Sequence, residues 1–252
     1  MRYQNILITG GTGKLGKALL ASSLNERNIL APTRAEMDIT DKTSVARYFN
    51  EHKIDAVVHC AALINLKECE NNPTAAIETN ILGTSNLVES ALKQQGIKFV
   101  YISTDYVYPC TTGLYREDSP TVPFTAYGWT KLGGECVVKV MREHCIIRTS
   151  FFDPANIPYD AAPSDAFCSK IPISELVNAI IMLLDRDFVG TINVGGERAS
   201  LYDIFKAHKP NIQPQTLEEI NRIAQIKRAV DSSLDVSLWN KFKAQANDYE
   251  QH

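Results

Sequence analysis

The sequence predicts an α/β fold with a doubly wound parallel sheet, and three observations support this prediction. Short apolar runs alternate with longer helical patterns over residues 1–150. The runs are β-branched and apolar on both faces, as strands are when helices cover both sides of a parallel sheet. A glycine-rich loop joins the first run to the first helical pattern, where sheets of this kind bind dinucleotides.

The expected elements divide the chain into a Rossmann domain and a smaller lobe. The Rossmann domain is expected over 1–150, and a shortened substrate lobe over 151–252. Within the lobe, a helix and a strand in 172–195 are expected to complete the sheet, and Ser200 is expected to cap a later helix. Strands are predicted at 5–10, 28–33, 55–62, 98–104 and 145–150, and helices at about 14–24, 42–52, 74–94 and 126–143.

The composition argues against several classes of protein. The 252 residues are 44% hydrophobic and 22% charged, as in an ordinary globular protein. The formal net charge is −3 without a basic run, so nucleic acid is not expected as a partner. No window of ~18 apolar residues predicts a membrane span. The N-terminus lacks a signal-peptide pattern, the six cysteines form no C-x-x-C, and no residue cluster predicts a metal, so a cytoplasmic protein with reduced thiols is expected.

The loop GGTGKLG (10–16) predicts nucleotide binding because it follows a strand and opens a helix. Gly10 permits the tight turn, Gly13 lets the backbone approach a pyrophosphate, and Gly16 lets the helix pack against the sheet. The N-terminus of that helix would then face the phosphates. The spacing G-x-x-G-x-x-G resembles the extended short-chain dehydrogenase/reductase superfamily.

Two charged residues near the end of the second predicted strand bear on the choice of cofactor. Arg34 would accommodate a 2′-phosphate, which favours NADP(H). Glu36 would bind a ribose 2′-hydroxyl instead, so NAD(H) stays open. The domain over 1–150 is therefore expected to bind NADP in preference to NAD.

The stretch TAYGWTK (125–131) places Tyr127 four residues before Lys131, on one face of a helix. The same spacing recurs at Tyr202 and Lys206, so the pattern alone does not identify a site. Thr104 ends the fourth predicted strand, and strand ends with the loops that follow them form the ligand crevice of this fold. We therefore expect Thr104, Tyr127 and Lys131 to converge, and Tyr202 to belong to a packed helix face.

These three residue types suit the reduction of a carbonyl. Adding hydride to carbon requires a proton for oxygen, and a phenol could supply it. Free tyrosine has a pKa of ~10, and a neighbouring lysine ammonium and a cationic nicotinamide both lower that pKa. Tyr127 is thus the expected acid, Lys131 its partner and a ligand of the nicotinamide ribose, and Thr104 the group that orients the carbonyl oxygen.

With these residues in view, the chain resembles the dTDP-4-dehydrorhamnose reductase family. The resemblance implies NADPH-dependent reduction of a 4-keto-6-deoxy sugar carried on a nucleoside diphosphate. It covers most of 1–150 and patches beyond. The resembling segments are ITGGTGKLG (8–16), RAEMDITD (34–41), DAVVHCAA (55–62), ETNILGTSNL (78–87), ISTDYVY (102–108), YREDSPTVPFTAYGWTKLGGE (115–135) and IIRTS (146–150), with a weaker echo in RAVDSSLD (228–235).

The resemblance also implies a role for each matching residue. Thr104, Tyr127 and Lys131 match the catalytic triad. Asp105 and Tyr106 match positions near the sugar, and Phe151 stands where the family typically has a tryptophan. The matching cofactor residues are Gly10, Thr12, Gly13, Lys14 and Leu15 in the phosphate loop, Asp38 and Ile39 at the adenine, Ala61 and Ala62 at a strand end, and Asn80, which supports the cofactor.

Three departures from the family bear on the substrate. Leu63-Ile64-Asn65 replaces a polar A-Y-T-type continuation, Phe151 lacks the indole N–H, and the stretch from Phe151 to Ile171 is short, as if a helix were missing. These departures keep other functions open. One is a non-catalytic NADP-binding regulatory subunit resembling the methionine adenosyltransferase beta subunit. Another is a sugar-nucleotide epimerase or dehydratase, although no glutamate follows Asp105 as a dehydratase would need. A homodimer is also left open.

Overall fold

A computed structural model describes residues 3–249, and the chain forms two compact units. The first unit consists of the residues up to Ser103, Thr125–Ile147 and Val177–Gly190. The second consists of Thr104–Phe124, Arg148–Leu176 and the residues from Thr191 onward. The chain thus passes between the units several times, whereas the sequence suggested one boundary near residue 150.

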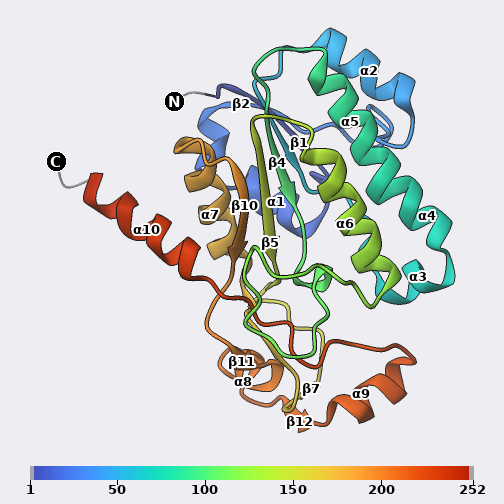
Figure 1. The fold of residues 1–252 in the computed structure, drawn as a ribbon, viewed down its shortest axis with the longest axis vertical. Helices are drawn as coiled ribbons and strands as arrows, with labels where there is room; N and C mark the ends of the chain where they lie inside the picture. Colours follow the sequence, from blue (N-terminus) through green and yellow to red (C-terminus); the bar gives the residue numbers. More distant parts are fainter. Residues whose placement is uncertain (1–2, 250–252) are drawn as a thin grey trace. The chain divides into compact units, whose positions relative to one another are not determined.

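A parallel sheet with flanking helices confirms the predicted α/β fold (Figure 1). Neighbouring strands in the first unit run parallel, with Leu7 opposite Val57 and Val100 opposite Cys145 in the register. The second predicted strand is shorter than expected and ends at Leu30. The sheet order is β2 (Asn28–Leu30), β1 (Asn5–Thr9), β3 (Ala56–His59), β4 (Lys98–Ile102), β5 (His144–Thr149) and β10 (Gly190–Val194).

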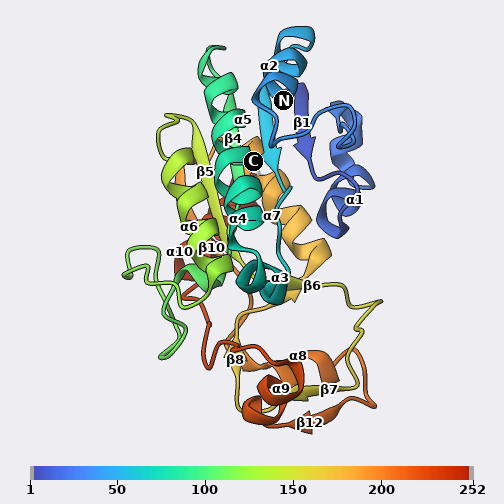
Figure 2. The ribbon, with the colours of Figure 1, turned by 90° about the vertical axis from the view of Figure 1, so that its right-hand side faces the viewer.

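Helices cover both faces of this sheet (Figure 2). Local capping explains where two of them begin: Asp41 accepts a hydrogen bond from the amide of Thr43, and Thr125 accepts one from the amide of Gly128. One face carries α1 (Lys14–Leu20) and α7 (Ile173–Asp185), with the short η1 (Ser23–Glu26) after α1, and the other carries α2 (Lys42–Glu51), α5 (Gly83–Leu92) and α6 (Ala126–Val138).

The long helix predicted at 74–94 is interrupted. It consists of α4 (Pro73–Ile77), a π-helical turn η2 (Glu78–Leu82) and then α5, and it follows a short α3 (Leu66–Asn71) that the sequence did not predict. Asn72 separates α3 from α4 and caps α4 through the amide of Ala75. Asn80 lies in the π turn, and π turns inside helices are frequent at functional sites.

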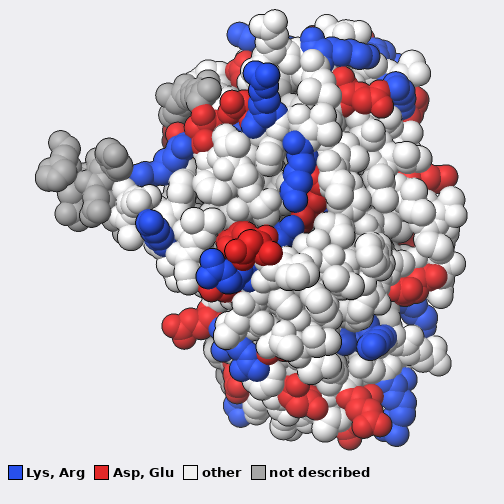
Figure 3. Space-filling model, in the orientation of Figure 1, with Lys and Arg blue, Asp and Glu red and all other residues white. Residues whose placement is uncertain are grey.

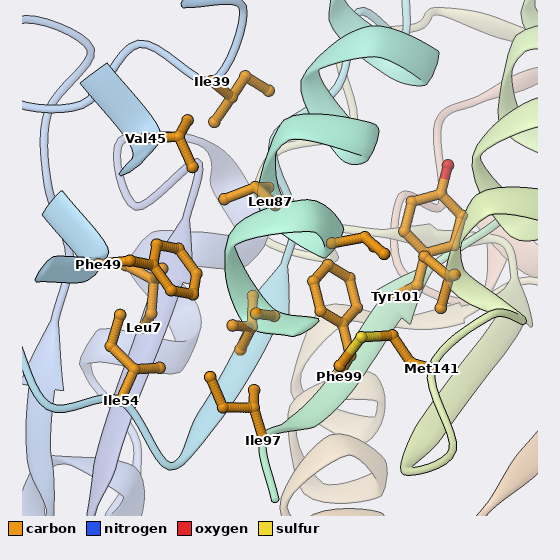
Figure 4. Packing of buried hydrophobic residues seen from close by; sticks show 14 of the residues in the cluster. Leu7, Ile39, Val45, Phe49, Ile54, Leu87, Ile97, Phe99, Tyr101 and Met141 are labelled. Atoms are coloured by element: carbon orange, nitrogen blue, oxygen red, sulfur yellow. The ribbon is translucent and has the colours of Figure 1, made fainter. Parts of the chain in front are cut away.

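The main core lies between the sheet and the helices α2 and α5 (Figure 4). Leu7, Leu87 and Phe99 are fully buried there, and Phe49 closes the cluster from α2. Burying a side chain of this size stabilises the fold by about 1.5–3 kcal/mol relative to leaving it exposed. This packing holds the carboxyl ends of β1, β3 and β4 in place for the site.

The second unit is built from short elements. Residues 151–172, where the sequence suggested a missing helix, form short strands. Its small apolar cluster contains Ala162, Phe205 and Ile212, and Ser200 caps α8 as predicted. The elements are η3 (Asp105–Val107), β6 (Phe151–Phe152), β7 (Ala161–Pro163), β8 (Phe167–Cys168), β9 (Ile171–Pro172), β11 (Ala199–Ser200), α8 (Leu201–Lys206), β12 (Gln213–Gln215), α9 (Leu217–Ala224) and α10 (Ser237–Tyr249).

The charges on the surface are mixed in sign. On the face shown in Figure 3, lysine and arginine side chains alternate with aspartate and glutamate side chains, without a continuous basic area. Within residues 3–249, no helix is both long enough and apolar enough to cross a membrane.

Candidate active site

The residues that the sequence predicts for the site fall into two groups, one in each unit. The predicted cofactor residues lie in the first unit together with Tyr127 and Lys131, and the predicted substrate residues lie in the second unit with Thr104. The first group is Gly10, Thr12, Gly13, Lys14, Leu15, Arg34, Asp38, Ile39, Ala61, Ala62, Asn80, Tyr127 and Lys131, and the second is Thr104, Asp105, Tyr106 and Phe151.

The loop after β1 needs glycine at two positions. Gly10 has φ +71°, in the left-handed region that other residues rarely adopt. A Cβ on Gly16 would lie 2.2 Å from the carbonyl oxygen of Gly10, so α1 packs directly against the loop. Gly13 is the N-cap of α1, no side chain caps it, and the first turn carries no acidic residue. The loop therefore presents backbone without negative charge, which fits a pyrophosphate.

The residues predicted to select the cofactor lie in the loop that follows β2. The carboxylate of Glu36 accepts hydrogen bonds from the amide (2.7 Å) and hydroxyl (2.9 Å) of Thr33, which hold the pKa of Glu36 below its usual value. The Arg34 side chain is 82% exposed and pairs with Asp38 at 2.9 Å. One carboxylate oxygen of Glu36 is thus held by its own turn, whereas the guanidinium of Arg34 is paired through Nε with Asp38 and is otherwise exposed.

Hydrogen bonds fix the backbone that follows β3. The amide of Ala61 donates to Thr9 Oγ1 at 3.2 Å, which ties the end of β3 to the end of β1. Buried Asn80 holds Leu63 on both sides: its Oδ1 accepts from the amide of Leu63 at 2.8 Å, and its Nδ2 donates to the carbonyl of Leu63 at 2.9 Å. Asn80 therefore shapes the predicted cofactor segment through its backbone.

Helix α6 carries the tyrosine–lysine pair at its N-terminus. The amide of Ala126 donates to Glu70 Oε1 at 2.8 Å, and Thr125 caps the same turn. Tyr127 is half-buried, whereas Lys131 is only 3% exposed. The ammonium of Lys131 lies 4.0 Å from the centre of the Tyr101 ring, a cation–π arrangement.

Burial lowers the pKa of Lys131 to about 7, while the carboxylate of Glu135 and the thiol of Cys60 act in the opposite direction. Burial raises the pKa of the Cys60 thiol to about 12, so near neutrality Cys60 is uncharged and the opposing effect on Lys131 comes from Glu135. Lys131 can therefore change its charge in the pH range where an enzyme works.

The second tyrosine–lysine pair is built differently. The ammonium of Lys206 is exposed and donates directly to the hydroxyl of Tyr202 at 2.5 Å. The Tyr202 ring packs beside the small cluster around Phe205. This agrees with the predicted packed helix face, so the burial of the lysine distinguishes the two pairs.

In the second unit, Thr104 and Asp105 form a closed group of hydrogen bonds. Thr104 Oγ1 donates to Asp105 Oδ1 at 2.9 Å and accepts from the amide of Tyr106 at 3.2 Å. Ser232 Oγ donates to Asp105 Oδ2 at 2.7 Å. Burial raises the pKa of Asp105 despite the nearby Lys170 charge and these hydroxyls. The proton of Thr104 is thus directed at Asp105 in this structure.

The two aromatic residues predicted near the sugar lie in different surroundings. The Tyr106 ring lies 5.3 Å from the Phe124 ring, and its hydroxyl accepts from the amide of Ala229 at 3.4 Å. Burial raises the pKa of Tyr106. Phe151 is half-buried in β6, opposite Ile171 of β9.

Sequence reasoning missed three polar partners of these residues. Ser232 donates to Asp105, Glu135 lies near Lys131, and His59 hydrogen bonds through both ring nitrogens. The weak echo in RAVDSSLD (228–235) was the available signal for Ser232. Across the described residues, no group of histidine, cysteine, aspartate and glutamate could hold a metal ion.

Comparison with known proteins decides the family. The family model of the RmlD substrate binding domain matches residues 4–153. The chain belongs to this family. As an RmlD-family protein, it is 39% identical over 158 residues to a dTDP-4-dehydrorhamnose reductase of Streptomyces griseus, a match that covers 60% of this chain and 51% of the relative. The chain spans about half the length of this relative and of two further curated relatives from Streptomyces.

Solved structures of the RmlD family extend the likeness over most of the chain. A dTDP-4-dehydrorhamnose reductase of Bacillus anthracis in complex with NADP has a TM-score of 0.85 at 25% identity, covering 94% of this chain and 92% of its own. One of Clostridium acetobutylicum has a TM-score of 0.82 at 26% identity, covering 98% and 100%.

Proposed function

We propose that the chain is an NADPH-dependent reductase of a nucleoside-diphosphate 4-keto-6-deoxy sugar. The observation that carries the proposal is the buried Lys131, one helical turn after Tyr127, in the unit that also holds the glycine loop. The exposed Lys206 beside Tyr202 lacks both features. Relatives named dTDP-4-dehydrorhamnose reductase support the proposed substrate class.

The residues of the first unit suit an NADPH-binding site, and NADPH when bound supplies the hydride. The glycine loop would hold the pyrophosphate, because α1 begins at Gly13, which carries no side chain, and its first turn has no acidic residue. Arg34 would face the 2′-phosphate, since Glu36 is bound to Thr33. An NADP complex of the Bacillus anthracis relative supports this assignment.

Tyr127 would donate the proton to the sugar oxygen. A charged Lys131 favours the phenolate that forms when the proton leaves, and burial strengthens this interaction by excluding water. Thr104 would orient the sugar oxygen by turning its hydroxyl away from Asp105, which retains the hydrogen bond from Ser232. General acid catalysis of this kind contributes about 10²–10⁴-fold to the rate.

Turnover measurements test the proposal. The protein is incubated with NADPH and a nucleoside-diphosphate 4-keto-6-deoxyhexose, and the loss of reduced-nicotinamide absorbance is followed. We expect Tyr127→Phe to lose at least about 100-fold in kcat and Tyr202→Phe to retain activity. If the parent binds NADPH tightly but shows no turnover, the reductase proposal is contradicted and a non-catalytic regulatory subunit is favoured. The short strands of 151–172 are the structural reason for considering that alternative. Equal activity of Tyr127→Phe would contradict the assigned acid.

We also propose that the protein works in the cytoplasm. Its six cysteines are all unpaired, as expected in a reducing compartment. Non-reducing electrophoresis of protein taken directly from cells tests this, and an intramolecular disulfide there would contradict it.

A further inference from the structure

His59 lies at the end of β3, buried with 1% of its surface exposed, and both ring nitrogens are engaged. Nδ1 lies 2.7 Å from Thr9 Oγ1 at the end of β1. Nε2 lies 2.9 Å from Thr84 Oγ1 on α5. The ring therefore bridges the strand that leads into the glycine loop and a helix on one face of the sheet.

The partners of the two threonines determine which nitrogen carries the proton. Thr84 Oγ1 donates its only proton to the carbonyl of Asn80 at 2.8 Å, so it must accept from Nε2–H. Nδ1 is then the acceptor and receives the hydroxyl proton of Thr9, whose oxygen in turn accepts from the amide of Ala61. Burial lowers the pKa of His59 to about 3, and the charge of Lys131 adds to this, so the ring is neutral.

The chain of hydrogen bonds continues through Asn80 to the Tyr127 helix. Asn80 Nδ2 donates to Thr130 Oγ1 at 2.9 Å, and Thr130 Oγ1 donates to the carbonyl of Tyr127 at 2.9 Å. Each hydroxyl along this path accepts one bond and donates the next. At Asn80 the path passes from the backbone carbonyl, which accepts from Thr84, to the side-chain amide, which donates to Thr130, so covalent bonds of Asn80 join the two runs of hydrogen bonds.

We propose that His59 is a positioning residue that couples the proposed cofactor-binding loop to Tyr127 through these hydrogen bonds, with Asn80 as their covalent link. The inference rests on the proposed function, because it assigns NADPH to the glycine loop and the proton to Tyr127. A cofactor that orders Thr9 and Ala61 favours one orientation of the His59 ring. That orientation favours the Thr84–Asn80–Thr130 bonds and so the backbone turn that aims the phenol. By linkage, a correctly placed Tyr127 helix strengthens cofactor binding by the same factor.

Packing alone does not require these groups. The centre of the His59 ring lies 6.1 Å from the centre of the Phe99 ring and 5.6 Å from that of Tyr101. A phenylalanine at position 59 would therefore fill the same space among aromatic neighbours. Buried polar networks are costly unless every member is satisfied, and here each donor and acceptor on the path has its partner. Beyond packing, the hydrogen-bond network specifies one arrangement of these side chains.

Hydrogen exchange of α6 with and without saturating NADPH tests the coupling. In the parent, NADPH should slow exchange of amides in the first turns of α6 by at least about fivefold, the low end of coupling between sites. His59→Phe and Thr84→Val should remove this slowing while still binding NADPH, and Thr84→Ser, which keeps the hydroxyl, should restore it. His52→Phe, a control histidine stacked on Tyr48, should behave as the parent.

A purely structural histidine would lower Tm in His59→Phe and leave the NADPH-dependent slowing intact, and that outcome overturns the proposal. A doubly protonated His59 in nitrogen-15 spectra near pH 6 also overturns it, because the path needs Nε2–H with a bare Nδ1. The exchange measurement needs no sugar. If NADPH slows exchange in α6 but the protein shows no turnover, only the reductase proposal is contradicted. If the protein turns over but NADPH does not slow exchange in α6, only the role of His59 is contradicted.

Discussion

Ser103 Oγ donates a hydrogen bond of 2.6 Å to Glu135 Oε1, and both side chains are buried. Ser103 follows β4 and directly precedes Thr104, while Glu135 lies on α6 one helical turn beyond Lys131. This bond holds a buried carboxylate beside the lysine. The carboxylate opposes the burial that lowers the pKa of Lys131, so it helps to keep that lysine charged near neutrality.

The first prediction concerns Glu135→Gln, which keeps an acceptor for Ser103 and removes the charge. The pKa of Lys131 should fall below its present value of about 7, because burial then acts unopposed by that carboxylate. If catalysis needs charged Lys131, the alkaline limb of kcat/KM should move to lower pH. A pH profile from 5 to 9 measures this. Glu89→Gln, which alters an exposed pair with Lys42, is the matched control, and an unmoved limb in Glu135→Gln contradicts the proposed role.

The second prediction concerns the double variant Lys131→Met/Glu135→Gln, which removes both buried charges. Replacing buried charges by neutral groups of similar volume is often neutral or stabilising by about 1–4 kcal/mol. We therefore expect Tm at pH 7 to stay equal or rise while activity is lost. The exposed pair variant Lys42→Met/Glu89→Gln should change stability by less than about 1 kcal/mol. A large fall in Tm of Lys131→Met/Glu135→Gln, without such a fall in Lys42→Met/Glu89→Gln, would show that the buried charges stabilise the fold.

The same lysine has a signature in the pH dependence of stability. Its pKa is about 7 when folded against 10.5 ordinarily, so between these values the unfolded chain holds more protons. The contribution of Lys131 to the free energy of unfolding is therefore unfavourable below pH 7 and improves as pH rises toward 10.5. Denaturant titrations from pH 6 to 9 should show this rise in the parent and lack it in the double variant.

The sequence predicted the parts of the fold and site that depend on local pattern. Alternating apolar runs located the strands, and three glycines in register located the turn before α1, because both signals arise within a few residues. The pattern Y-x-x-x-K did not separate Tyr127 from Tyr202 by itself. Burial separates them, and burial depends on how distant segments pack.

Hydrogen-bond partners far apart in sequence were not predictable for the same reason. Ser232 reaches Asp105 across 127 positions, and His59 joins Thr9 to Thr84. The π turn at Asn80 was also not predictable, because the helical sequence pattern is continuous from residue 74 to 94. Local propensity describes each element, whereas these contacts follow from the tertiary arrangement.

The fourth prediction concerns cofactor choice. Because Glu36 is bound to Thr33 and Arg34 faces solvent, Arg34→Ala should weaken NADPH binding by about tenfold and leave NADH binding unchanged, the loss being that of a charge-assisted contact to phosphate. Fluorescence titration with both cofactors measures this. Arg142→Ala, an exposed arginine that follows α6, is the control. Equal loss for NADPH and NADH would place Arg34 away from the 2′-phosphate.

The last prediction concerns Ser232→Ala in the second unit. The buried carboxyl of Asp105 has a raised pKa, so the unfolded chain holds fewer protons than the folded one between the two pKa values. The contribution of Asp105 to stability is thus best at acidic pH and worsens as pH rises through that range. Loss of the 2.7 Å bond from Ser232 should raise the pKa of Asp105 further and lower the free energy of unfolding by about 1–3 kcal/mol.

Urea titrations of Ser232→Ala and the parent measure this loss of stability, which should be larger at pH 8 than at pH 5. Ser164→Ala, whose hydroxyl is exposed, should show neither change, and a deficit independent of pH would mean that Ser232 acts through packing and not through the Asp105 charge.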